Sequence, residues 1–245
     1  MSRPLLSIII PAYNEEHRLP RTLEQVFSFL SEQSYTAEVI VVENGSHDRT
    51  LEIARSYEER LSQLRILQLA ERGKGRAVQH GMLQANGEYC FMCDADLSMP
   101  VGEINRFLPP TLTDFDIAIA SREAPGSVRI NEPAYRHFIG RIFNSMIQVL
   151  ALPELNDTQC GFKCFRAAVV QDLFKQQTLP GWSFDVEVLF IARRRGYRIV
   201  EVPIHWYFNP DSKIRVFKDS LRMAIDLLTI RRNAMRGKYR GDART

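Results

Sequence analysis

Cysteine is scarce in this sequence, and its placement disfavours zinc or redox chemistry. The four cysteines among the 245 residues are Cys90, Cys93, Cys160 and Cys164. Cys90 and Cys93 have CxxC spacing, but they fall in a predicted strand, where an odd separation directs two side chains to opposite faces. We therefore expect buried thiols.

Long apolar runs are also missing. No stretch reaches the ~18 consecutive apolar residues that a membrane-spanning helix requires. The N-terminus runs directly into a predicted strand and not into a secretion signal. We expect a cytoplasmic protein, or one attached peripherally to the cytoplasmic face of a membrane.

A strong overall charge is absent as well. Lysine and arginine total 32 against 29 acidic residues, and a net charge of +3 indicates no nucleic-acid partner. The C-terminal residues 231–245 nevertheless contain one acid, Asp242, and six bases: Arg231, Arg232, Arg236, Lys238, Arg240 and Arg244. Such a tail suits an anionic surface, but it also suits simple solubility.

Two common nucleotide-binding signatures do not occur. The sequence lacks GxxxxGK[ST], which argues against direct ATP hydrolysis, and no GxGxxG follows the first predicted strand, which argues against a typical dinucleotide-dependent enzyme. There is no internal repeat and no low-complexity segment.

The sequence does contain an alternation of short apolar runs with amphipathic helical patterns. Such runs indicate strands buried on both faces of a parallel sheet. The runs expected to be strands are residues 5–10, 38–42, 64–69, 89–93, 115–121 and 198–204. The pattern predicts an α/β fold, a mostly parallel sheet with right-handed crossovers and helices on both faces.

Four loops follow the carboxyl ends of the first four strands: residues 11–16, 43–50, 71–75 and 94–98. Open α/β sheets bind ligands at this edge, so we expect the loops to converge on one crevice. Asn14, in the first loop, is a candidate N-cap for the following helix. In the last loop, Asp94 and Asp96 can hold a divalent ion, which in turn holds phosphates. The alternative is a solvated turn that caps the next helix.

Three segments of the second half of the chain each allow two interpretations. Residues 135–152 form an amphipathic helix that either packs on the sheet or lies in a membrane interface. Asp185 and Glu187 open a helix, where they either cap its positive end or belong to a site. The final helix, residues 216–235, has an apolar stripe widened by Met223 and Leu227. It is predicted to lie on anionic lipid, with packing on the sheet as the alternative.

Eight short motifs together resemble one enzyme family. PAYNEE, VVENGSHDRT, RGKGRA and DADLS follow the first four predicted strands and resemble the GT-A glycosyltransferases of family 2. DTQCGFK, WSFDVE, EVPIHW and DSKIR narrow the resemblance to the polyprenyl (dolichyl)-phosphate sugar synthases, both β-glucosyltransferases and mannosyltransferases. The resemblance extends to about Met235. It implies a catalytic domain over residues 1–213, followed by an amphipathic helix and basic tail over 214–245 that attach to a membrane surface.

The resemblance implies metal-dependent, inverting transfer of a hexose from a nucleotide sugar to a polyprenyl phosphate. DTQCGFK and WSFDVE look more like the glucosyl branch, which favours UDP-glucose over GDP-mannose. A family relative that glycosylates a soluble acceptor is an alternative. A third interpretation is a non-catalytic nucleotide-sugar-binding scaffold, against which the intact acidic pair argues.

The same resemblance assigns donor-site roles. Asp94 and Asp96 match the pair that binds Mg²⁺ or Mn²⁺ and the diphosphate. Ser98 stands where some mannosyltransferases have Gln, so the third metal ligand is not assigned. Glu43 and Asn44 replace a commoner Asp-Asp pair. The positions that match the donor-binding set are Pro11, Tyr13, Glu15, Val42, Asn44, Lys74, Ala95 and Lys213.

On the acceptor side, Arg122 and Arg136 match arginines that hold the lipid phosphate. Trp182, Asp185 and Glu187 lie in the sugar- and acceptor-side motif. A phosphate acceptor is already largely ionised near neutral pH, because its second pKa is about 6. The reaction therefore has little need of a general base, for which the candidates are Asp157 and Asp185.

Overall fold

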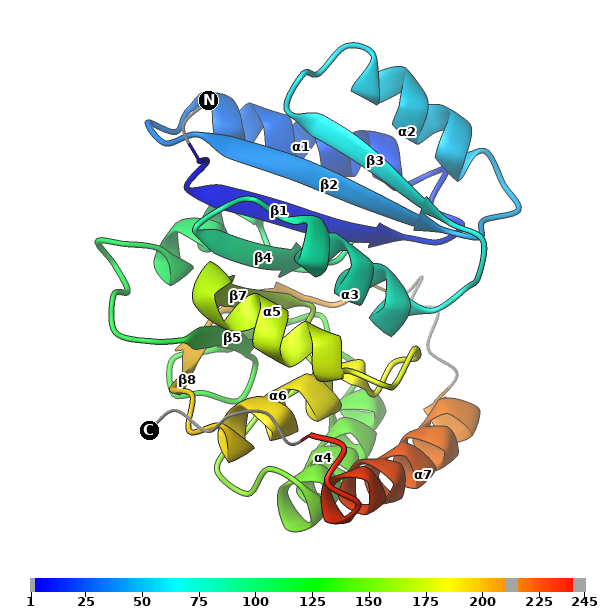
Figure 1. Ribbon diagram of the computed structural model, residues 1–245, viewed down its shortest axis with the longest axis vertical. Coiled ribbons are helices and arrows are strands. Elements are labelled where there is room, and N and C mark those ends of the chain that lie inside the picture. Colours follow the sequence, from blue (N-terminus) through cyan, green and yellow to red (C-terminus); the bar gives the residue numbers. More distant parts are fainter. Residues whose placement is uncertain (1–2, 210–215, 240–245) are drawn as a thin grey trace.

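A seven-stranded sheet forms the centre of the molecule, and helices cover both of its faces (Figure 1). The computed structural model of the chain describes residues 3–209 and 216–239, except for the side chains of 216–221. The strand order in the sheet is β3-β2-β1-β4-β7-β5-β8. The predicted α/β class is confirmed.

The first four strands pair in parallel, as the sequence predicts. They are β1 (Leu6–Ala12), β2 (Ala37–Asn44), β3 (Leu64–Leu69) and β4 (Tyr89–Cys93). β1 lies between β2 and β4, and all seven of its residues are buried. In Figure 1 the arrowheads of these strands point to the same edge of the sheet, which places the four predicted loops together.

The other half of the sheet contains one strand that the sequence analysis did not predict. β7 (Phe162–Arg166) runs antiparallel between β4 and β5 (Ile117–Ser121). β8 (Ile199–Pro203) pairs in parallel with β5. The predicted strands at 115–121 and 198–204 are therefore confirmed, and the sheet is mostly but not wholly parallel. A separate two-stranded sheet joins β6 (Val128–Ile130) to β9 (His205–Tyr207).

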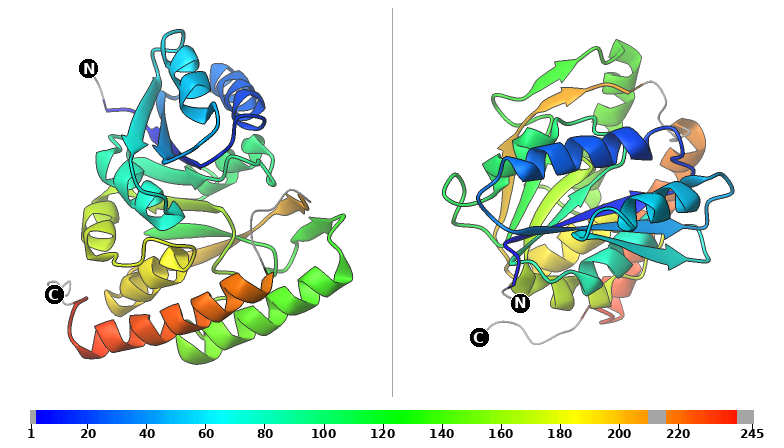
Figure 2. Two further views of the ribbon diagram at one scale, coloured as in Figure 1. Left: turned by 90° about the vertical axis from the view of Figure 1, so that its right-hand side faces the viewer. Right: turned by 90° about the horizontal axis from the view of Figure 1, so that it is seen from above.

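Two apolar cores lie on opposite faces of the sheet. One contains α1 (Leu19–Ser31), α2 (Thr50–Glu58) and the 3₁₀ helix Val101–Phe107. The other contains α3 (Lys74–Gln84), α5 (Ala167–Gln176) and α6 (Phe184–Arg194). Beyond α6, α4 (Ala134–Leu150) and α7 (Val216–Met235) lie side by side (Figure 2). No helix within residues 3–209 and 216–239 is long and apolar enough to span a membrane.

The cysteines behave as the strand periodicity predicts. Cys93 belongs to the α1-side core and Cys90 to the α3-side core, so their side chains point to opposite faces. All four thiols are free and buried. Burial raises the pKa of Cys90 to about 12 and that of Cys160 to about 11, which keeps both thiols protonated.

The prediction that Asn14 caps the first helix is wrong. Helix α1 begins at Leu19 without a side-chain cap. Asn14 adopts a left-handed conformation, with φ of 51°, which asparagine tolerates better than most residues. Its backbone N–H donates to the Ser46 hydroxyl at 3.0 Å, and its Oδ1 accepts the His47 N–H at 2.9 Å. The side chain therefore ties the first loop to the second.

Candidate active site

The loops at the carboxyl edge of the sheet are joined to one another by the side chain of Asn44. Its Nδ2 donates to the carbonyl of Ala12 at 3.0 Å, and its Oδ1 accepts the Gly73 N–H at 3.1 Å. Asn44 is buried, so the protein itself uses its amide group to link the ends of β1, β2 and β3. The predicted convergence of the loops is confirmed, while a role for Asn44 beside the base stays a prediction.

One aromatic ring marks the predicted nucleoside side of the crevice. The Arg72 guanidinium lies 4.3 Å from the Tyr13 ring centroid, and the His47 ring meets Tyr13 edge-on at 6.4 Å. Arg72 and His47 were not among the predicted residues. Both stand in predicted loops, so their loop positions were the available signal.

The other predicted donor residues at this edge belong mainly to the framework. Pro11 and Val42 are paired in register on β1 and β2, and both are buried. The Glu15 carboxylate forms an ion pair with Arg18 at 2.6 Å, and the Ala95 carbonyl accepts the Thr22 hydroxyl at 2.6 Å. Lys213 lies outside the described residues. The donor-binding roles of these positions stay predictions.

The acidic pair at the end of β4 meets a lysine from the third loop. Lys74 Nζ lies 2.7 Å from Asp94 Oδ1 and 2.8 Å from Asp94 Oδ2. The same ammonium lies 5.0 Å from the Trp182 ring centroid. Asp96 Oδ1 accepts the Ser98 N–H at 3.0 Å. Three residues of the predicted donor set, Lys74, Asp94 and Asp96, thus lie together.

The electrostatics of this cluster favour a further cation. Burial and then the charge of Asp94 raise the pKa of Asp96 above its ordinary value. Burial lowers the pKa of Lys74, but the carboxylates of Asp94 and Asp185 more than offset this, and that pKa lies above its ordinary value. Three buried or half-buried carboxylates, those of Asp94, Asp96 and Asp185, therefore share two ammonium groups, Lys74 and Lys163, and a divalent ion would offset the negative charge that is left.

The donor set fits a divalent ion that substrate oxygens complete. Within the described ranges, no group of three or more His, Cys, Asp and Glu side chains is placed to hold a metal. Mg²⁺ typically takes one or two carboxylates together with substrate phosphates and water, which matches two aspartates. Gly161 lies against this site, because a Cβ there would overlap the Asp94 carboxylate.

A buried ion pair lies beside the acidic pair. Lys163, on β7, is 3.0 Å from Asp185 Oδ1 at the start of α6, and both side chains are at most 5% exposed. Burial raises the pKa of Asp185, although Lys163 and Lys74 oppose the change. The second acid of the motif, Glu187, is fully buried and accepts hydrogen bonds from Thr178, which makes it a framework residue. Both acids lie in the first turn of α6, where a negative charge suits the helix dipole, but their carboxylates bind Lys163 and the segment before the helix.

Arg122 and Asp157 form a closed pair on the predicted acceptor side. Arg122 donates from Nε to Oδ2 at 2.6 Å, from Nη2 to Oδ1 at 2.9 Å, and from its backbone N–H to Oδ2 at 3.0 Å. Burial raises the pKa of Asp157, but the Arg122 guanidinium outweighs burial and holds it at about 2. Asp157 is therefore an ionised partner of Arg122 at neutral pH.

A row of cations and aromatic rings joins the two predicted acceptor arginines. Arg122 lies 5.3 Å from the Trp206 ring centroid, and Trp206 lies 6.2 Å from Phe208. Arg136 lies 5.1 Å from Phe208, and a third arginine, Arg129, lies 5.9 Å from Trp206. Arg129 and Phe208 were not predicted, because they lie outside the eight motifs. We call these five residues the arginine–aromatic row.

Comparisons with known proteins agree with this geometry. The family profile described as Glycosyl transferase family 2 matches residues 7–174. Dolichyl-phosphate beta-glucosyltransferase of Dictyostelium discoideum is 35% identical over 240 residues, which cover 92% of this chain and 73% of that protein. The human protein of the same name is 32% identical over 250 residues, covering 96% and 77%.

Solved structures share the fold at lower identity. Glucosyl-3-phosphoglycerate synthase from Mycobacterium tuberculosis, in complex with Mn²⁺ and UDP-glucose, has a TM-score of 0.67 and 17% identity, covering 93% of this chain and 79% of that chain. A mannosyltransferase from Pyrobaculum calidifontis, in complex with GDP-mannose and Mn²⁺, has a TM-score of 0.58 and 19% identity, covering 99% and 66%.

Proposed function

Since the chain belongs to glycosyltransferase family 2, we propose that it transfers glucose from UDP-glucose to a polyprenyl phosphate such as dolichyl phosphate, with inversion at the anomeric carbon. The observation that carries the proposal is the position of two phosphate subsites next to each other. The acidic pair with Lys74 suits a metal-bound diphosphate, and the arginine–aromatic row suits the acceptor phosphate. The relatives named dolichyl-phosphate beta-glucosyltransferase support the choice of sugar and acceptor.

Two contacts support the proposal that these subsites are neighbours. Residues 157–161 form one short segment, in which Asp157 binds Arg122 and Gly161 lies against Asp94. On the other side, the Tyr207 N–H donates to the Ser98 carbonyl at 2.7 Å. The strand that carries Trp206 is therefore fixed to the loop that carries Asp96.

The proposal gives the charged side chains of the two subsites distinct roles. Asp94 and Asp96 would hold a divalent ion, Mg²⁺ or Mn²⁺, which when bound would stabilise the negative charge that develops on the leaving diphosphate. Lys74 places a positive charge at the same position. Arg136 suits the acceptor phosphate because no carboxylate in the described part of the chain pairs with it.

The proposal assigns Asp157 to orienting Arg122 and not to accepting a proton. A general base works best with a pKa near the operating pH, and the Asp157 carboxyl has a pKa of about 2. The acceptor phosphate needs little deprotonation, since its second pKa is about 6. Asp185 stays a candidate for the sugar side of the site.

We further propose that α4 and α7 attach the protein to a membrane surface. Both helices leave large apolar side chains exposed: Tyr135, Phe138, Ile142, Val149, Ile225, Leu228 and Met235. Exposed bases lie on the same two helices: Arg141, Arg222, Arg231 and Arg232. An apolar face flanked by bases suits an anionic bilayer. The division into a catalytic part, residues 1–213, and an attachment part, 214–245, remains part of this proposal.

The burial of individual residues corrects the predicted α7 stripe and shows two faces on α4. Met223 and Leu227, which were expected to widen the α7 stripe, are 9% and 1% exposed and face the protein. On α4, the apolar side chains with helical spacing do not all face one way: Ile147 is fully buried, while Phe138 and Ile142 are more than half exposed. Each helix therefore covers the core with one face and presents another face outward.

A labelled-sugar assay tests the proposed reaction. Protein is incubated with Mg²⁺ or Mn²⁺ and radiolabelled UDP-glucose or GDP-mannose, with and without a polyprenyl phosphate. We expect acceptor-dependent, organic-extractable label from UDP-glucose. Organic-extractable label from GDP-mannose alone would show that the protein is a mannosyltransferase. A water-soluble product would show that the acceptor is soluble. Nucleotide-sugar binding without transfer would show that the protein is a non-catalytic scaffold.

A further inference from the structure

The segment of residues 177–185 supports the loop that carries Lys74. Gly75 has no room for a side chain, because a Cβ there would stand 2.7 Å from the Leu179 carbonyl and 2.9 Å from the Gly181 carbonyl. A Cβ on Gly73 would stand 2.7 Å from the Pro180 carbonyl. We call residues 177–185 the supporting segment. The position of Lys74 depends on it, since both flanking glycines pack on its backbone.

Glu187 holds the first half of the supporting segment. Its carboxylate accepts the Thr178 N–H at 2.9 Å, the Thr178 hydroxyl at 2.6 Å and the Leu179 N–H at 2.8 Å. Glu187 is fully buried, and a buried carboxylate must be satisfied by donors. The fourth donor is the hydroxyl of Tyr239, at 2.7 Å, from the chain that follows α7.

The C-terminal part of the chain adds a second bond at this position. Asn233 Nδ2 donates to the Thr178 hydroxyl oxygen at 3.1 Å and approaches the Tyr239 hydroxyl at 3.3 Å. Asn233 and Tyr239 are both 5% exposed. Burial, followed by the hydrogen bond to Glu187, raises the pKa of Tyr239, so its hydroxyl stays a donor at every working pH.

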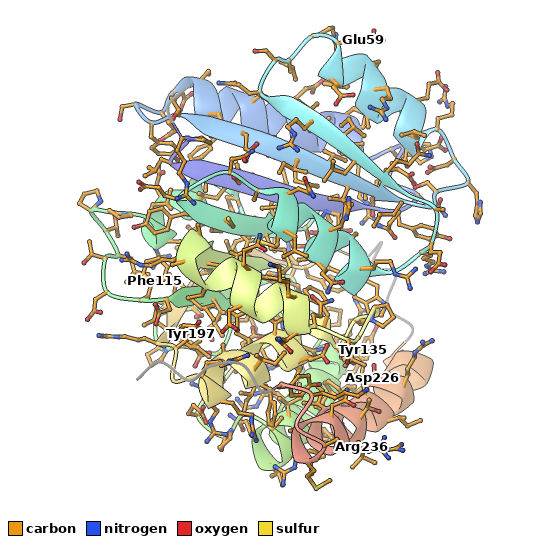
Figure 3. The ribbon with its side chains drawn as sticks, in the orientation of Figure 1. Glu59, Phe115, Tyr135, Tyr197, Asp226 and Arg236 are labelled. Atoms are coloured by element: carbon orange, nitrogen blue, oxygen red, sulfur yellow. The ribbon has the colours of Figure 1, made fainter. Side chains whose placement is uncertain are left out.

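The other end of the supporting segment is also bonded to α7. The Ser183 hydroxyl donates to Asp226 Oδ2 at 2.7 Å, and Figure 3 labels Asp226 on that helix. Ser183 directly follows Trp182 and precedes Asp185 by two positions. Leu227 and Ile230 of α7 are buried in the same core as α6, which fixes the helix beside it.

We propose that Tyr239, Asn233 and Asp226 are positioning residues for the donor site. They act on the supporting segment, and the supporting segment acts on the loop of Lys74. The inference rests on the proposed function in that this loop binds the donor diphosphate. The proposed function gives α7 and the residues that follow it a role in membrane attachment. The present inference adds a second role, in which they help to set the affinity for the nucleotide.

The variant Tyr239→Phe tests the inference by removing one hydroxyl. Its matched control is Tyr35→Phe, because the Tyr35 hydroxyl donates to Asn105 at 2.8 Å on an exposed surface. Coupling through a packed network typically changes affinity by roughly 2- to 30-fold. We expect Tyr239→Phe to raise the KM for UDP-glucose and the Kd for UDP with Mn²⁺ within this range. Tyr35→Phe should change neither, and the acceptor KM should stay constant.

Hydrogen exchange distinguishes failure of this inference from failure of the proposed function. In the full-length protein without ligand, Tyr239→Phe should speed exchange of the amides of residues 73–77 and 178–179, and Tyr35→Phe should not. This readout is independent of the substrate. Unchanged exchange at 73–77 would overturn the positioning role, whatever the enzyme transfers.

Two further outcomes are decisive. If Tyr239→Phe only lowered the active fraction, with both KM values and the UDP Kd unchanged, the hydroxyl would serve general stability and the inference would be wrong. If Tyr239→Phe did not fold, Ser183→Ala would replace it, since it removes the bond to Asp226 at the other end. A weaker UDP affinity in Ser183→Ala would support the inference, and an unchanged one would refute it.

Discussion

Replacing Asp157 by asparagine should destabilise the fold strongly at neutral pH and much less in acid. The Arg122 guanidinium holds the pKa of Asp157 at about 2, against an ordinary value of 3.8. A lowering of this size corresponds to about 2 kcal/mol of folding stability. Leaving the half-buried Arg122 without its counter-ion raises the expected loss only toward the lower end of the ~3–5 kcal/mol typical of a broken buried pair.

The sign of the pH effect follows from the direction of the shift. A carboxyl whose pKa is lowered by folding contributes its full stability above the unfolded value, near pH 4. That contribution disappears as the pH falls from about 4 toward 2. The stability difference between wild type and Asp157→Asn should therefore be constant from pH 7 to about 5 and shrink below pH 4.

Urea unfolding at a series of pH values measures this difference directly. Transfer assays on the same variant should show a higher acceptor KM, because Arg122 loses its fixed orientation, with the donor KM unchanged. An equal stability of the two proteins at pH 7 would refute the electrostatic argument. A loss confined to kcat, with a matching change in the pH–rate profile, would instead make Asp157 a base.

Four other predictions test the site and the surface. Asp96→Asn should nearly abolish transfer while circular dichroism stays unchanged, because the metal would lose one of two protein ligands; near-normal turnover would remove the metal assignment. Arg136→Ala should weaken acceptor use roughly ten- to a hundred-fold without affecting UDP affinity, in line with the ~1.5–3 kcal/mol of a charge-assisted bond; a loss of UDP affinity would move Arg136 to the donor site. Gly161→Ala should weaken Mn²⁺ binding in isothermal titration, because its Cβ would overlap Asp94, and unchanged Mn²⁺ affinity would contradict that contact. Phe138→Asp with Leu228→Asp should abolish flotation on anionic liposomes, and flotation equal to wild type would refute the proposed attachment face.

The flotation test has a control elsewhere on the surface. Ser34 and Ser62 are exposed in the loops that follow α1 and α2, the helices that cover the other face of the sheet, so the double variant Ser34→Asp/Ser62→Asp adds the same two charges without touching the proposed face. It should float like wild type on anionic liposomes at low salt. A deletion of α7 would be a poor test, because Leu227 and Ile230 belong to the core.

Local patterns predicted the first half of the fold well. β1 to β4 are apolar runs, and each is followed by loop residues. Because parallel strands all end at the same edge of a sheet, these loops meet there whatever the order of the strands. The pairing of Lys74 with Asp94 confirms that edge, although neither residue signals the other in the sequence. β7 escaped prediction because Lys163 interrupts its apolar run, and a buried lysine is recognisable only once its partner Asp185 is placed.

Side-chain bonds over long distances in the chain account for the rest of what the sequence did not predict. Tyr239 lies in a stretch whose bases suggested a solvated tail, yet its hydroxyl is buried against Glu187, 52 residues earlier. Asn14 had the composition of a helix cap, but the backbone of His47 competed successfully for its carbonyl. Such bonds have no periodicity, so no local pattern could reveal them.

On the proposed assignments, the segment between Asp157 and Gly161 limits how far apart the two phosphate subsites can lie. One end orients the acceptor arginine and the other touches the donor carboxylate, and four peptide units span at most about 14 Å. The distance between these two contact points is therefore limited by covalent chain length and not only by packing. Because the effective molarity of two bound reactants depends steeply on their mutual placement, a single inserted residue here would lower turnover even if each substrate still bound normally.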